Sequence, residues 1–328
     1  MKMRDILISE DIQGAAIDVL RSRFDVVSLQ DLWKDAEELR VRVKEFRGLI
    51  VRNQTNVDSA LLDAAENLVV VGRAGVGLDN VDVEHATRLG VVVTSTPDQN
   101  AISVAELAIG LMVSLARMLP QANSDTHAGN WNRREFLGTE LYGKTFGIVG
   151  AGKIGYLTAR RAQAFGMKIV ACDPFISRDN VLLSELQADL VDFDELLSVC
   201  DVVSCHLPAN KHTAGIFDLS RFRKMKPTSF LINTARGEVI READLFQALK
   251  TGMIAGAALD VRATEPPVPG ELEALPNLIL IPHIAAFTRE AQDRVIQAIC
   301  EDVARVLDGK TSQNAVNKVS RAVAVAAR

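Results

Sequence analysis

The chain is poor in the residues that build metal centres and disulfide frameworks. Only five of its 328 residues are histidines and only four are cysteines. Cys172, Cys200, Cys205 and Cys300 show no C-x-x-C spacing, which argues against a bound metal cluster. Cys172 and Cys205 lie in apolar runs, where a small buried thiol is the expected role. No metal site is therefore predicted.

A strong excess of one charge is also absent. The net charge is −5, and no broad basic stripe appears along the chain. Nucleic acid and membrane surfaces are therefore not expected as partners. Hydrophobic residues make up 48% and charged residues 24%, as in ordinary globular proteins. The N-terminal residues do not resemble a signal peptide, so we expect a cytoplasmic protein.

One long apolar run, residues 101–119, needs separate treatment. It contains Glu106 and Arg117, and Asn100 precedes it as a candidate N-cap. A membrane-spanning helix would leave Glu106 in hydrocarbon. The run instead predicts a fully buried helix, packed between domains or against a second subunit.

The first part of the chain alternates between strand-like and helix-like segments. Alternating strands and helices predict a parallel sheet with helices on both faces. The length of 328 residues indicates about two such domains. The predicted strands are 5–8, 26–29, 48–51, 68–71 and 91–94, and the predicted helices are 12–21, 36–46, 58–65 and 80–89.

The strongest motif lies in residues 145–173. A short apolar strand ends at a G-x-G-x-x-G turn formed by Gly150, Gly152 and Gly155, and a helix and a second strand, 168–172, follow. The first glycine permits the tight turn, the second lets a pyrophosphate approach bare backbone, and the third lets helix and strand pack closely. The amides that open the helix favour an anion. The motif predicts a dinucleotide site.

Asp173 follows the second strand of this motif, about 20 residues after the glycines, where such folds place an acid on the adenosine ribose. A carboxylate there accepts a hydrogen bond from the 2′-hydroxyl and repels a 2′-phosphate. The next arginine in the chain is Arg178. We therefore expect the cofactor to be NAD rather than NADP.

The mid-chain position of the glycine motif predicts the domain organisation. We expect two doubly wound parallel-sheet α/β domains, with a Rossmann dinucleotide-binding domain inserted into a discontinuous substrate-binding domain. The boundaries predicted are 1–97 plus 288–328 for the substrate-binding domain and 98–287 for the NAD-binding domain. The polar, amphipathic segment 121–142 is too long for a simple connection, and it is predicted to be a dimerisation arm. Residues 308–328 cannot be placed.

Three polar residues follow predicted strands of the second domain and form a candidate catalytic set. Arg236 follows 231–235, Glu265 follows 259–261, and His283 follows 281–282. Ligands of open parallel sheets bind beyond the carboxyl ends of the strands, so these side chains are expected to converge. Arginine suits a carboxylate, and histidine exchanges a proton with a forming alkoxide. A carboxylate orients the histidine and favours its charged form.

Taken together, the motif strings resemble the D-isomer-specific 2-hydroxyacid dehydrogenases over nearly the whole chain. They are Gly-Ile-Val-Gly-Ala-Gly-Lys-Ile-Gly at 147–155, Asn-Thr-Ala-Arg-Gly at 233–237 and Pro-His-Ile-Ala at 282–285. The resemblance implies that Arg236, Glu265 and His283 are catalytic and that Asp260 binds the nicotinamide carboxamide. The other cofactor-binding positions that it implies are Gly150, Gly152, Lys153, Ile154, Gly155, Asp173, Leu207, Pro208, Thr234 and Ala235.

Within that family, residues 71–82 and 116–141 resemble the members that oxidise 3-phosphoglycerate in serine biosynthesis. The resemblance implies that the amides of Ala74, Gly75 and Val76 bind the substrate carboxylate together with Arg236. It makes Arg52 and Arg73 candidates for the substrate phosphate. It also implies that Arg134, on the arm, reaches the site of a partner subunit in a homodimer. A tetramer is the alternative assembly.

Two short segments depart from the family pattern. Where members often have Phe-Glu-Glu-Glu-Pro, this chain has Arg262-Ala263-Thr264-Glu265-Pro266, and Phe287 precedes Thr288 where small or hydroxylic residues are common. Both changes border the expected substrate pocket. They bear on the substrate more than on the type of reaction. The long regulatory extension of some members is also missing, so serine feedback through it is not expected.

The predicted function is NAD-dependent hydride transfer at C2 of a small 2-hydroxy or 2-oxo acid, with 3-phosphoglycerate as the leading substrate. The nearest alternative is a hydroxypyruvate or glyoxylate reductase, which needs the same catalytic residues but no phosphate site. An alternative of another class is a dinucleotide-sensing interaction protein, because the family includes transcriptional corepressors. The resemblance, and not the residues alone, implies the D stereochemistry.

Overall fold

The computed structural model describes residues 3–177 and 179–319, and the chain divides into two compact units. The first unit comprises Met1–Asn100 with Thr288–Arg328, and the second comprises Ala101–Phe287. The first unit is therefore discontinuous in sequence, and the second is inserted into it. Each unit contains one parallel sheet with helices on both faces, which confirms the predicted fold class.

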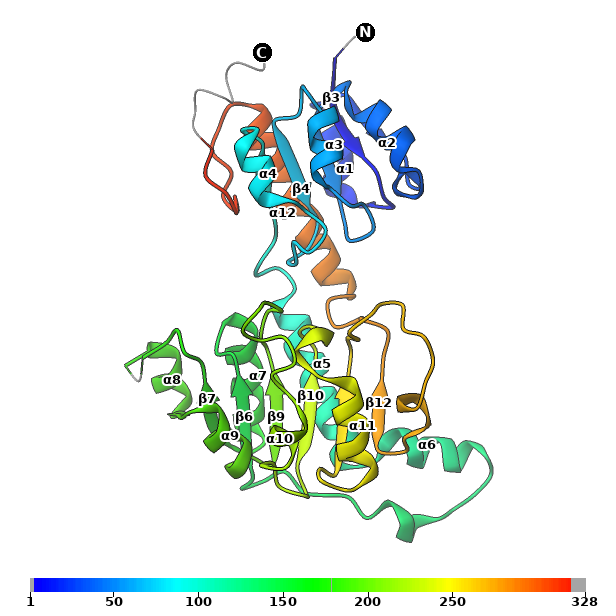
Figure 1. The fold of residues 1–328 in the computed structure, drawn as a ribbon, viewed down its shortest axis with the longest axis vertical. Coiled ribbons are helices and arrows are strands. Elements are labelled where there is room, and N and C mark those ends of the chain that lie inside the picture. The colour runs from blue at the N-terminus through cyan, green and yellow to red at the C-terminus, as the bar shows by residue number, and fades with distance from the viewer. Residues whose placement is uncertain (1–2, 178, 320–328) are drawn as a thin grey trace. The chain divides into compact units, whose positions relative to one another are not determined.

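The first unit is built on five strands in the order β2-β1-β3-β4-β5 (Figure 1). All of their pairings are parallel. The strands are β1 (Arg4–Ile8), β2 (Val26–Ser28), β3 (Phe46–Val51), β4 (Val70–Arg73) and β5 (Val92–Thr94). The helices are α1 (Ala15–Arg21), α2 (Ala36–Val43), α3 (Ser59–Ala64), α4 (Val83–Arg88) and α12 (Arg289–Leu307), with a short 3₁₀ turn η1 (Leu32–Lys34).

Alternating side chains along these strands form two separate apolar layers, because successive residues of a strand point to opposite faces. Leu7 and Leu49 pack in the layer that contains α2, α3 and α4. Ile6 and Ile50 pack in the layer that contains α1 and α12. The helix α12, which follows the whole second unit in sequence, thus completes the core of the first. Burial on both faces explains why the strands read as continuous apolar runs.

The buried carboxylate of Asp302, on α12, fixes the segment after that helix. It accepts hydrogen bonds from the Thr94 hydroxyl at 3.0 Å, the Gln313 amide at 2.6 Å and the Asn314 side-chain amide at 2.6 Å. A buried carboxylate needs such donors to offset its desolvation. Ala315 then forms an antiparallel bridge with Thr94. Part of the tail that the sequence could not place therefore lies along β5, and residues 320–328 fall outside the described part of the chain.

The second unit is built on seven strands in the order β12-β11-β10-β9-β6-β7-β8. The strands are β6 (Thr145–Val149), β7 (Lys168–Cys172), β8 (Asp189–Leu190), β9 (Val202–Cys205), β10 (Phe230–Asn233), β11 (Gly256–Leu259) and β12 (Leu278–Leu280). The helices are α5 (Ala101–Ala116), α6 (Leu119–His127), α7 (Lys153–Ala164), α8 (Val181–Leu186), α9 (Phe193–Val199), α10 (Leu219–Phe222) and α11 (Glu242–Lys250). Short 3₁₀ turns are η2 (Arg133–Phe136), η3 (Gly237–Val239) and η4 (Leu272–Ala274).

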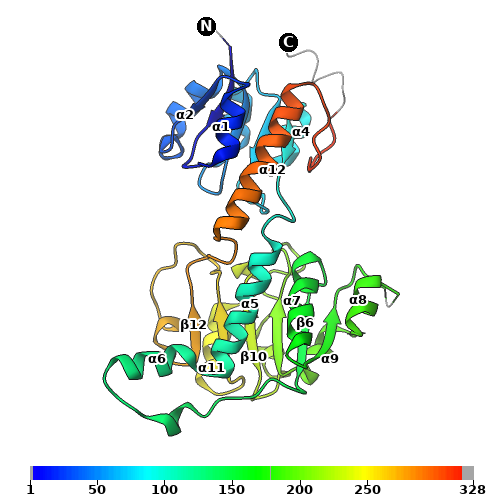
Figure 2. The same cartoon turned by 180° about the vertical axis from the view of Figure 1, so that it is seen from behind.

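Helices cover both faces of this larger sheet. α5, α7 and α8 pack on one face, and α9, α10 and α11 pack on the other (Figures 1 and 2). The chain leaves β6 for β7 on one side, and β9 pairs with the other side of β6. The direction of strand order therefore reverses at β6, and open α/β sheets bind ligands at such a reversal.

The apolar run 101–119 differs from its prediction. α5 ends at Ala116, and α6 starts after Met118, whose φ of 48° is left-handed. Ile102 and Glu106 are exposed on α5 in the single chain, and the predicted packing of this helix between domains or against a second subunit stays a prediction. Glu106 forms an ion pair with Arg161 at 3.3 Å.

Within the described residues, no single helix has both the length and the apolar character needed to cross a membrane. α5 and α6 satisfy that test only as a pair, and they meet at a bend of 64°.

Candidate active site

The predicted site residues of the second unit follow the carboxyl ends of neighbouring strands. Because these strands are parallel, their carboxyl ends lie on one edge of the sheet. The strand order arranges the residues in a row: His283 after β12, Glu265 after β11, Arg236 after β10, Leu207 and Pro208 after β9, Gly150 after β6 and Asp173 after β7. The sequence prediction that these segments converge therefore agrees with the topology.

The glycine turn has the shape that the sequence predicts. Gly150 has a φ of 94°, and a Cβ added there would lie 2.8 Å from the carbonyl oxygen of His206. A Cβ on Gly155 would lie 2.2 Å from the carbonyl oxygen of Gly150. A Cβ on Gly152 would meet no atom within 4 Å. Gly150 and Gly155 are thus required by the fold, whereas Gly152 faces open space where an anion can approach the backbone.

The same turn leads into α7, with Gly152 as the N-cap and Lys153 and Ile154 in its first turn. A glycine cap provides no side chain to accept hydrogen bonds from the first helical amides. These amides and the positive end of the helix dipole are therefore available to a bound phosphate. The turn fits the pyrophosphate of a dinucleotide.

Asp173 joins the end of β7 to the glycine turn. Its carboxylate accepts a hydrogen bond from the amide of Ala151 at 2.9 Å and another from the amide of Phe175 at 2.9 Å. A carboxylate has about four lone-pair sites, so two remain for further donors. Asp173 can therefore accept a ribose hydroxyl while it holds the turn in place.

The turn after β10 also fits a ligand. The Asn233 side chain closes it by donating to the Arg236 carbonyl at 2.8 Å and accepting from the Ala235 amide at 3.0 Å. Thr234 is only 7% exposed, and its hydroxyl has no hydrogen-bond partner among the described residues. Buried hydroxyls normally have partners. An unsatisfied hydroxyl at this edge is the kind of group that a bound cofactor satisfies.

Glu265 and His283 form a hydrogen-bonded pair, with 2.7 Å between Glu265 Oε2 and His283 Nδ1. Their side chains are 37% and 48% exposed, so the pair is accessible to a ligand. The carboxylate fixes Nδ1 as a donor and leaves Nε2 as the ring nitrogen for proton exchange. This is the arrangement expected of a general acid–base with an orienting partner.

Asp260 anchors the loop that carries the histidine. Its buried carboxylate accepts the amides of Ile284 at 2.7 Å and Ala285 at 2.9 Å, and its carbonyl accepts the amide of His283 at 2.7 Å. Burial raises the pKa of Asp260, while the two amides oppose that rise. The predicted contact of Asp260 with a nicotinamide carboxamide stays a prediction, because the hydrogen bonds seen here are to the loop.

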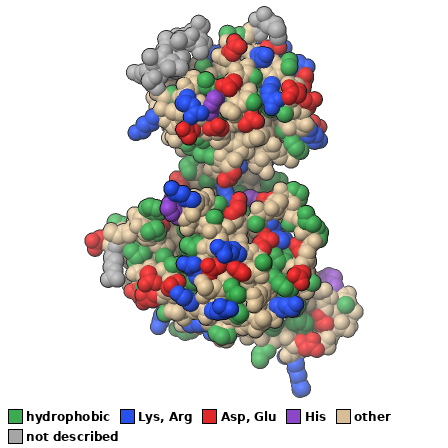
Figure 3. Space-filling view, viewed as in Figure 1, with side chains coloured by type: hydrophobic (Ala, Val, Ile, Leu, Met, Phe, Trp, Pro, Cys, Tyr) green, Lys and Arg blue, Asp and Glu red, His purple; other side chains and the backbone are tan. Residues whose placement is uncertain are grey.

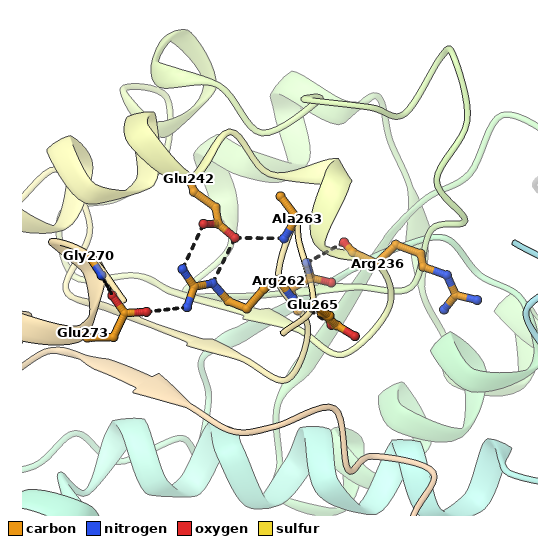
Figure 4. Close-up of polar contacts among 8 residues, drawn as sticks. Arg236, Glu242, Arg262, Ala263, Glu265, Gly270 and Glu273 are labelled. Atoms are coloured by element: carbon orange, nitrogen blue, oxygen red, sulfur yellow. Dashed lines mark hydrogen bonds and ion pairs between the residues drawn. The ribbon is translucent and has the colours of Figure 1, made fainter. Parts of the chain in front are cut away.

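Arg236 is half-buried, and its Nη1 donates to the carbonyl of Ala235 at 2.8 Å. The next residue, Gly237, touches the neighbouring loop: a Cβ there would lie 2.0 Å from the carbonyl carbon of Arg262. Figure 4 shows the Arg236 guanidinium pointing away from the ion pairs of Arg262. The loops that carry Arg236 and Glu265 are therefore in backbone contact. The Arg236 side chain extends away from this contact.

The structure adds a residue that the sequence reading missed. His206 follows β9 in the string His-Leu-Pro, and its Nε2 lies 3.0 Å from the hydroxyl of Ser204. Burial lowers the pKa of His206 to about 4, so its ring is neutral near pH 7. A neutral, half-buried ring is unsuited to donate the catalytic proton. The available sequence signal was a histidine directly after a buried strand.

The remaining candidates lie elsewhere. Arg52, Arg73 and the 74–76 loop belong to the first unit, and Arg134 is exposed on η2 of the second. The amide of Ala74 donates to the Val51 carbonyl and that of Gly75 to the Arg73 carbonyl, both at 2.8 Å. Two of the three amides expected to bind a carboxylate therefore already have acceptors. Their role in substrate binding stays a prediction.

Arg52 belongs to a loop that is organised around a buried carboxylate. Glu10 is 2% exposed and accepts the amides of Arg52 at 2.7 Å, Gln54 at 3.1 Å and Thr55 at 2.9 Å. Burial lowers the pKa of Arg52, and the charge of Glu10 acts in the opposite direction. The guanidinium remains charged at neutral pH. A partly desolvated arginine on a fixed loop is suited to an anionic ligand.

On the face of the second unit seen in Figure 3, basic and acidic side chains are interspersed. Within residues 3–177 and 179–319, no group of three or more His, Cys, Asp or Glu side chains is arranged to hold a metal ion.

Comparison with known proteins gives consistent results. Residues 109–285 match the NAD-binding domain of the D-isomer-specific 2-hydroxyacid dehydrogenases. The chain is 43% identical over 313 residues to D-3-phosphoglycerate dehydrogenase of Archaeoglobus fulgidus, covering 95% of this chain and 59% of that protein. It is 40% identical over 316 residues to the human protein of the same name, covering 96% and 58%. The chain thus spans less than two thirds of the length of these relatives.

Solved structures give the same result for the fold. A protein of Thermus thermophilus superposes with a TM-score of 0.89 at 34% identity, over 95% of this chain and all of that one (100%). A glyoxylate reductase from Paecilomyes thermophila superposes with a TM-score of 0.86 at 30% identity, over 96% and 99%. The second unit is therefore similar to NAD-binding domains, as the glycine motif predicts.

The different surroundings of the glycines generate a paired prediction. Gly152→Ala should leave the thermal unfolding midpoint nearly unchanged but weaken NAD binding about tenfold or more, because the added methyl occupies the phosphate approach. Gly155→Ala should lower the midpoint, because its methyl would overlap the Gly150 carbonyl and overpacking costs about 1–3 kcal/mol. Calorimetric titration and thermal unfolding measure the two effects. Normal NAD affinity in Gly152→Ala would contradict the proposed phosphate position.

Proposed function

Because this chain belongs to the D-isomer-specific 2-hydroxyacid dehydrogenases, we propose that it is an NAD-dependent enzyme that oxidises a 2-hydroxy acid or reduces the matching 2-oxo acid. The observation that carries the proposal is the Glu265–His283 pair at the carboxyl edge of the second unit, in a row with the glycine turn. At the nicotinamide ring, NAD⁺ would accept the hydride in the oxidation and NADH would supply it in the reduction.

His283 is the proposed acid–base. In oxidation its Nε2 accepts the proton of the substrate hydroxyl, and in reduction the imidazolium returns a proton to the forming alkoxide. Glu265 holds the ring through Nδ1 and stabilises the imidazolium that forms. Arg236 follows the adjacent strand β10 and is proposed to bind the substrate carboxylate through its guanidinium.

The glycine turn, Asp173 and Thr234 are the proposed cofactor-binding residues of the second unit. Amides at the start of α7 receive the pyrophosphate, and Asp173 accepts the adenosine ribose hydroxyl. The Thr234 hydroxyl, which has no partner among the described residues, gains one when the cofactor is bound. The preference expected is NAD over NADP, because a carboxylate repels a 2′-phosphate.

The proposed substrate is 3-phosphoglycerate, or 3-phosphohydroxypyruvate in the reverse direction, at the start of serine biosynthesis. Support comes from the relatives that bear the name D-3-phosphoglycerate dehydrogenase. Arg52, Arg73 and the 74–76 loop are the proposed substrate-binding residues of the first unit. A hydroxypyruvate or glyoxylate reductase is the second candidate, because a structure named glyoxylate reductase is also similar to this chain.

The proposed assembly is a homodimer formed through the 121–142 arm, with Arg134 near the partner's site. The arm exposes three large apolar side chains to solvent. Trp131 is 78%, Leu137 88% and Tyr142 77% exposed. Contact with a partner would remove these three side chains from water, which favours association. A cytoplasmic location is proposed because the four cysteines are free thiols.

The substrate assignment is tested by following NADH oxidation with phosphohydroxypyruvate, hydroxypyruvate, glyoxylate and pyruvate. The first compound should give the highest kcat/KM. Arg52→Ala should lower kcat/KM for the phosphorylated compound by about tenfold to a hundredfold, as for loss of a charged hydrogen bond, with little effect on hydroxypyruvate. Arg42→Ala, which removes an exposed arginine of the same unit, is the matched control. Equal losses of kcat/KM on phosphohydroxypyruvate and on hydroxypyruvate would show that Arg52 does not bind the phosphate.

The catalytic assignment is tested by His283→Ala. This variant should lower kcat by about 10²–10⁴-fold while NAD affinity stays near the wild-type value, because general acid–base catalysis is lost and the cofactor residues are intact. His85→Ala is the matched control, since His85 also pairs with a carboxylate, Asp63, at 2.6 Å but lies in the first unit on α4. A turnover of His283→Ala equal to that of the control would remove His283 from the mechanism.

The cofactor preference is tested by Asp173→Ala. The ratio of NAD affinity to NADP affinity should fall by about tenfold to a hundredfold, because a charged hydrogen bond to the ribose is lost together with the repulsion of a 2′-phosphate. The absolute affinity for both cofactors should also fall, because the glycine turn loses the bond from Ala151. Fluorescence titrations with each cofactor give the ratio, and an unchanged ratio would show that Asp173 does not select NAD.

A further inference from the structure

An arginine stands between two carboxylates at the place where the sequence departs from the family pattern. Arg262 follows β11, and its side chain is 10% exposed. Its Nε and Nη2 donate to the two oxygens of Glu242 at 2.9 and 3.0 Å, and its Nη1 donates to Glu273 at 2.6 Å. Figure 4 shows the guanidinium between Glu242 and Glu273. A two-pronged arginine–carboxylate contact fixes orientation as well as distance.

Backbone hydrogen bonds extend this ion-pair cluster to Glu265, the carboxylate that contacts His283. The amide of Ala263 donates to Glu242 at 2.9 Å, so Glu242 holds the side chain of Arg262 and the next peptide together. The amide of Arg262 donates to Glu265 Oε1 at 3.0 Å. The other oxygen of Glu265 contacts His283 at 2.7 Å. The position of the Arg262 backbone therefore sets the position of one oxygen of the carboxylate that orients the histidine.

The cluster also reaches the loop of Arg236. The Arg262 backbone packs so closely on Gly237 that a Cβ there would lie 2.0 Å from its carbonyl carbon. Gly237 is the residue after Arg236. A shift of the Arg262 backbone would therefore disturb the loops on both sides of β11.

The charges of the cluster are stable over a wide pH range. Hydrogen bonds from Arg262 lower the pKa of Glu242, and they lower the pKa of Glu273 to about 2. Both carboxylates thus remain ionised at neutral and mildly acidic pH. Loss of the arginine would leave two like charges facing each other beside the loop, which disfavours the observed arrangement.

We propose that Arg262 is a positioning residue, which holds Glu265 against His283 by fixing the 262–265 loop to Glu242 on α11 and to Glu273 in η4. The inference rests on the proposed function, because Glu265 orients His283 only if His283 exchanges the proton in the proposed reaction. Arg262 itself is not a catalytic residue, since it acts only through Glu265. Displacement of a catalytic group by about 1 Å is enough to lower a rate about a hundredfold.

The first test compares Arg262→Leu and Arg262→Lys with Arg221→Leu. Arg221 pairs with Asp218 at 3.2 Å on α10 of the same unit, and it serves as the control for losing a partly buried arginine. Arg262→Leu should lower kcat about tenfold to a hundredfold, with NADH affinity within about twofold of wild type. Arg262→Lys should recover part of the rate, because lysine keeps the charge but loses the fork. A kcat of Arg262→Leu equal to that of Arg221→Leu would overturn the proposal.

A double-mutant cycle separates positioning from a general loss of stability. If Arg262 acts through Glu265, Arg262→Leu should change kcat by less than about twofold in a Glu265→Gln background. Additive losses would overturn the proposal, because they would show that Arg262 acts independently of Glu265. If Arg262→Leu does not fold, the Glu242→Gln/Glu273→Gln variant weakens the same cluster while keeping the arginine, and it should show the same loss of kcat and the same dependence on Glu265.

A crystal structure of Arg262→Leu distinguishes failure of this inference from failure of the proposed function. We expect Glu265 to lie beyond hydrogen-bonding distance of His283 in this variant, whatever substrate the enzyme uses. A Glu265–His283 pair that stays at its present separation in this variant would overturn the inference even if the wild type is an active dehydrogenase. Absence of wild-type turnover on the 2-oxo acid panel would instead count against the proposed function, and the structure of the variant would still decide the role of Arg262.

Discussion

The parallel pairing of β10, β11 and β12 is the constraint on which the candidate site depends. Each strand delivers one polar residue to the same edge, so side chains separated in sequence become neighbours without a shared loop. Glu265 and His283 meet at 2.7 Å because the strands before them are adjacent and end in register. The buried carboxylate of Asp260 then ties the backbone of the histidine loop to the end of β11. Catalytic geometry here follows from sheet hydrogen bonding first and from side-chain pairing second.

Sequence patterns predicted the parts of the fold that follow from local chemistry. Strand β7 matches its predicted range, because a short apolar run between polar segments defines it. The apolar run at 101–119 was expected to be one helix, but α5 ends at Ala116 and left-handed Met118 precedes α6, a break that composition alone does not reveal. The segment after α12 was not placed, because its attachment depends on the buried carboxylate of Asp302 and its partners around β5.

Motifs in the sequence point to the candidate site residues but not to the side chains that support them. The glycines, Asp173 and the Glu265–His283 pair carry recognisable strings and spacings. The Arg262 cluster does not, because Glu242 and Glu273 lie on elements whose proximity exists only in the folded chain. The same is true of Glu10, which gathers the amides of the 52–55 loop from a distant position in sequence. Motifs reveal groups that touch a ligand, whereas groups that hold those groups in place depend on tertiary contacts.

The two units of the chain hold different groups of the proposed site residues. All of the proposed acid–base and cofactor residues lie in the second unit, whereas Arg52, Arg73 and the 74–76 loop lie in the first. We therefore expect a change in the first unit to alter which 2-hydroxy acid is bound without altering the proposed chemistry at His283. The similar proteins bear names for different substrates, D-3-phosphoglycerate dehydrogenase and glyoxylate reductase, so one fold accommodates both. The choice between a phosphorylated and an unphosphorylated substrate is therefore proposed to lie with the loop around Arg52 rather than with the Glu265–His283 pair.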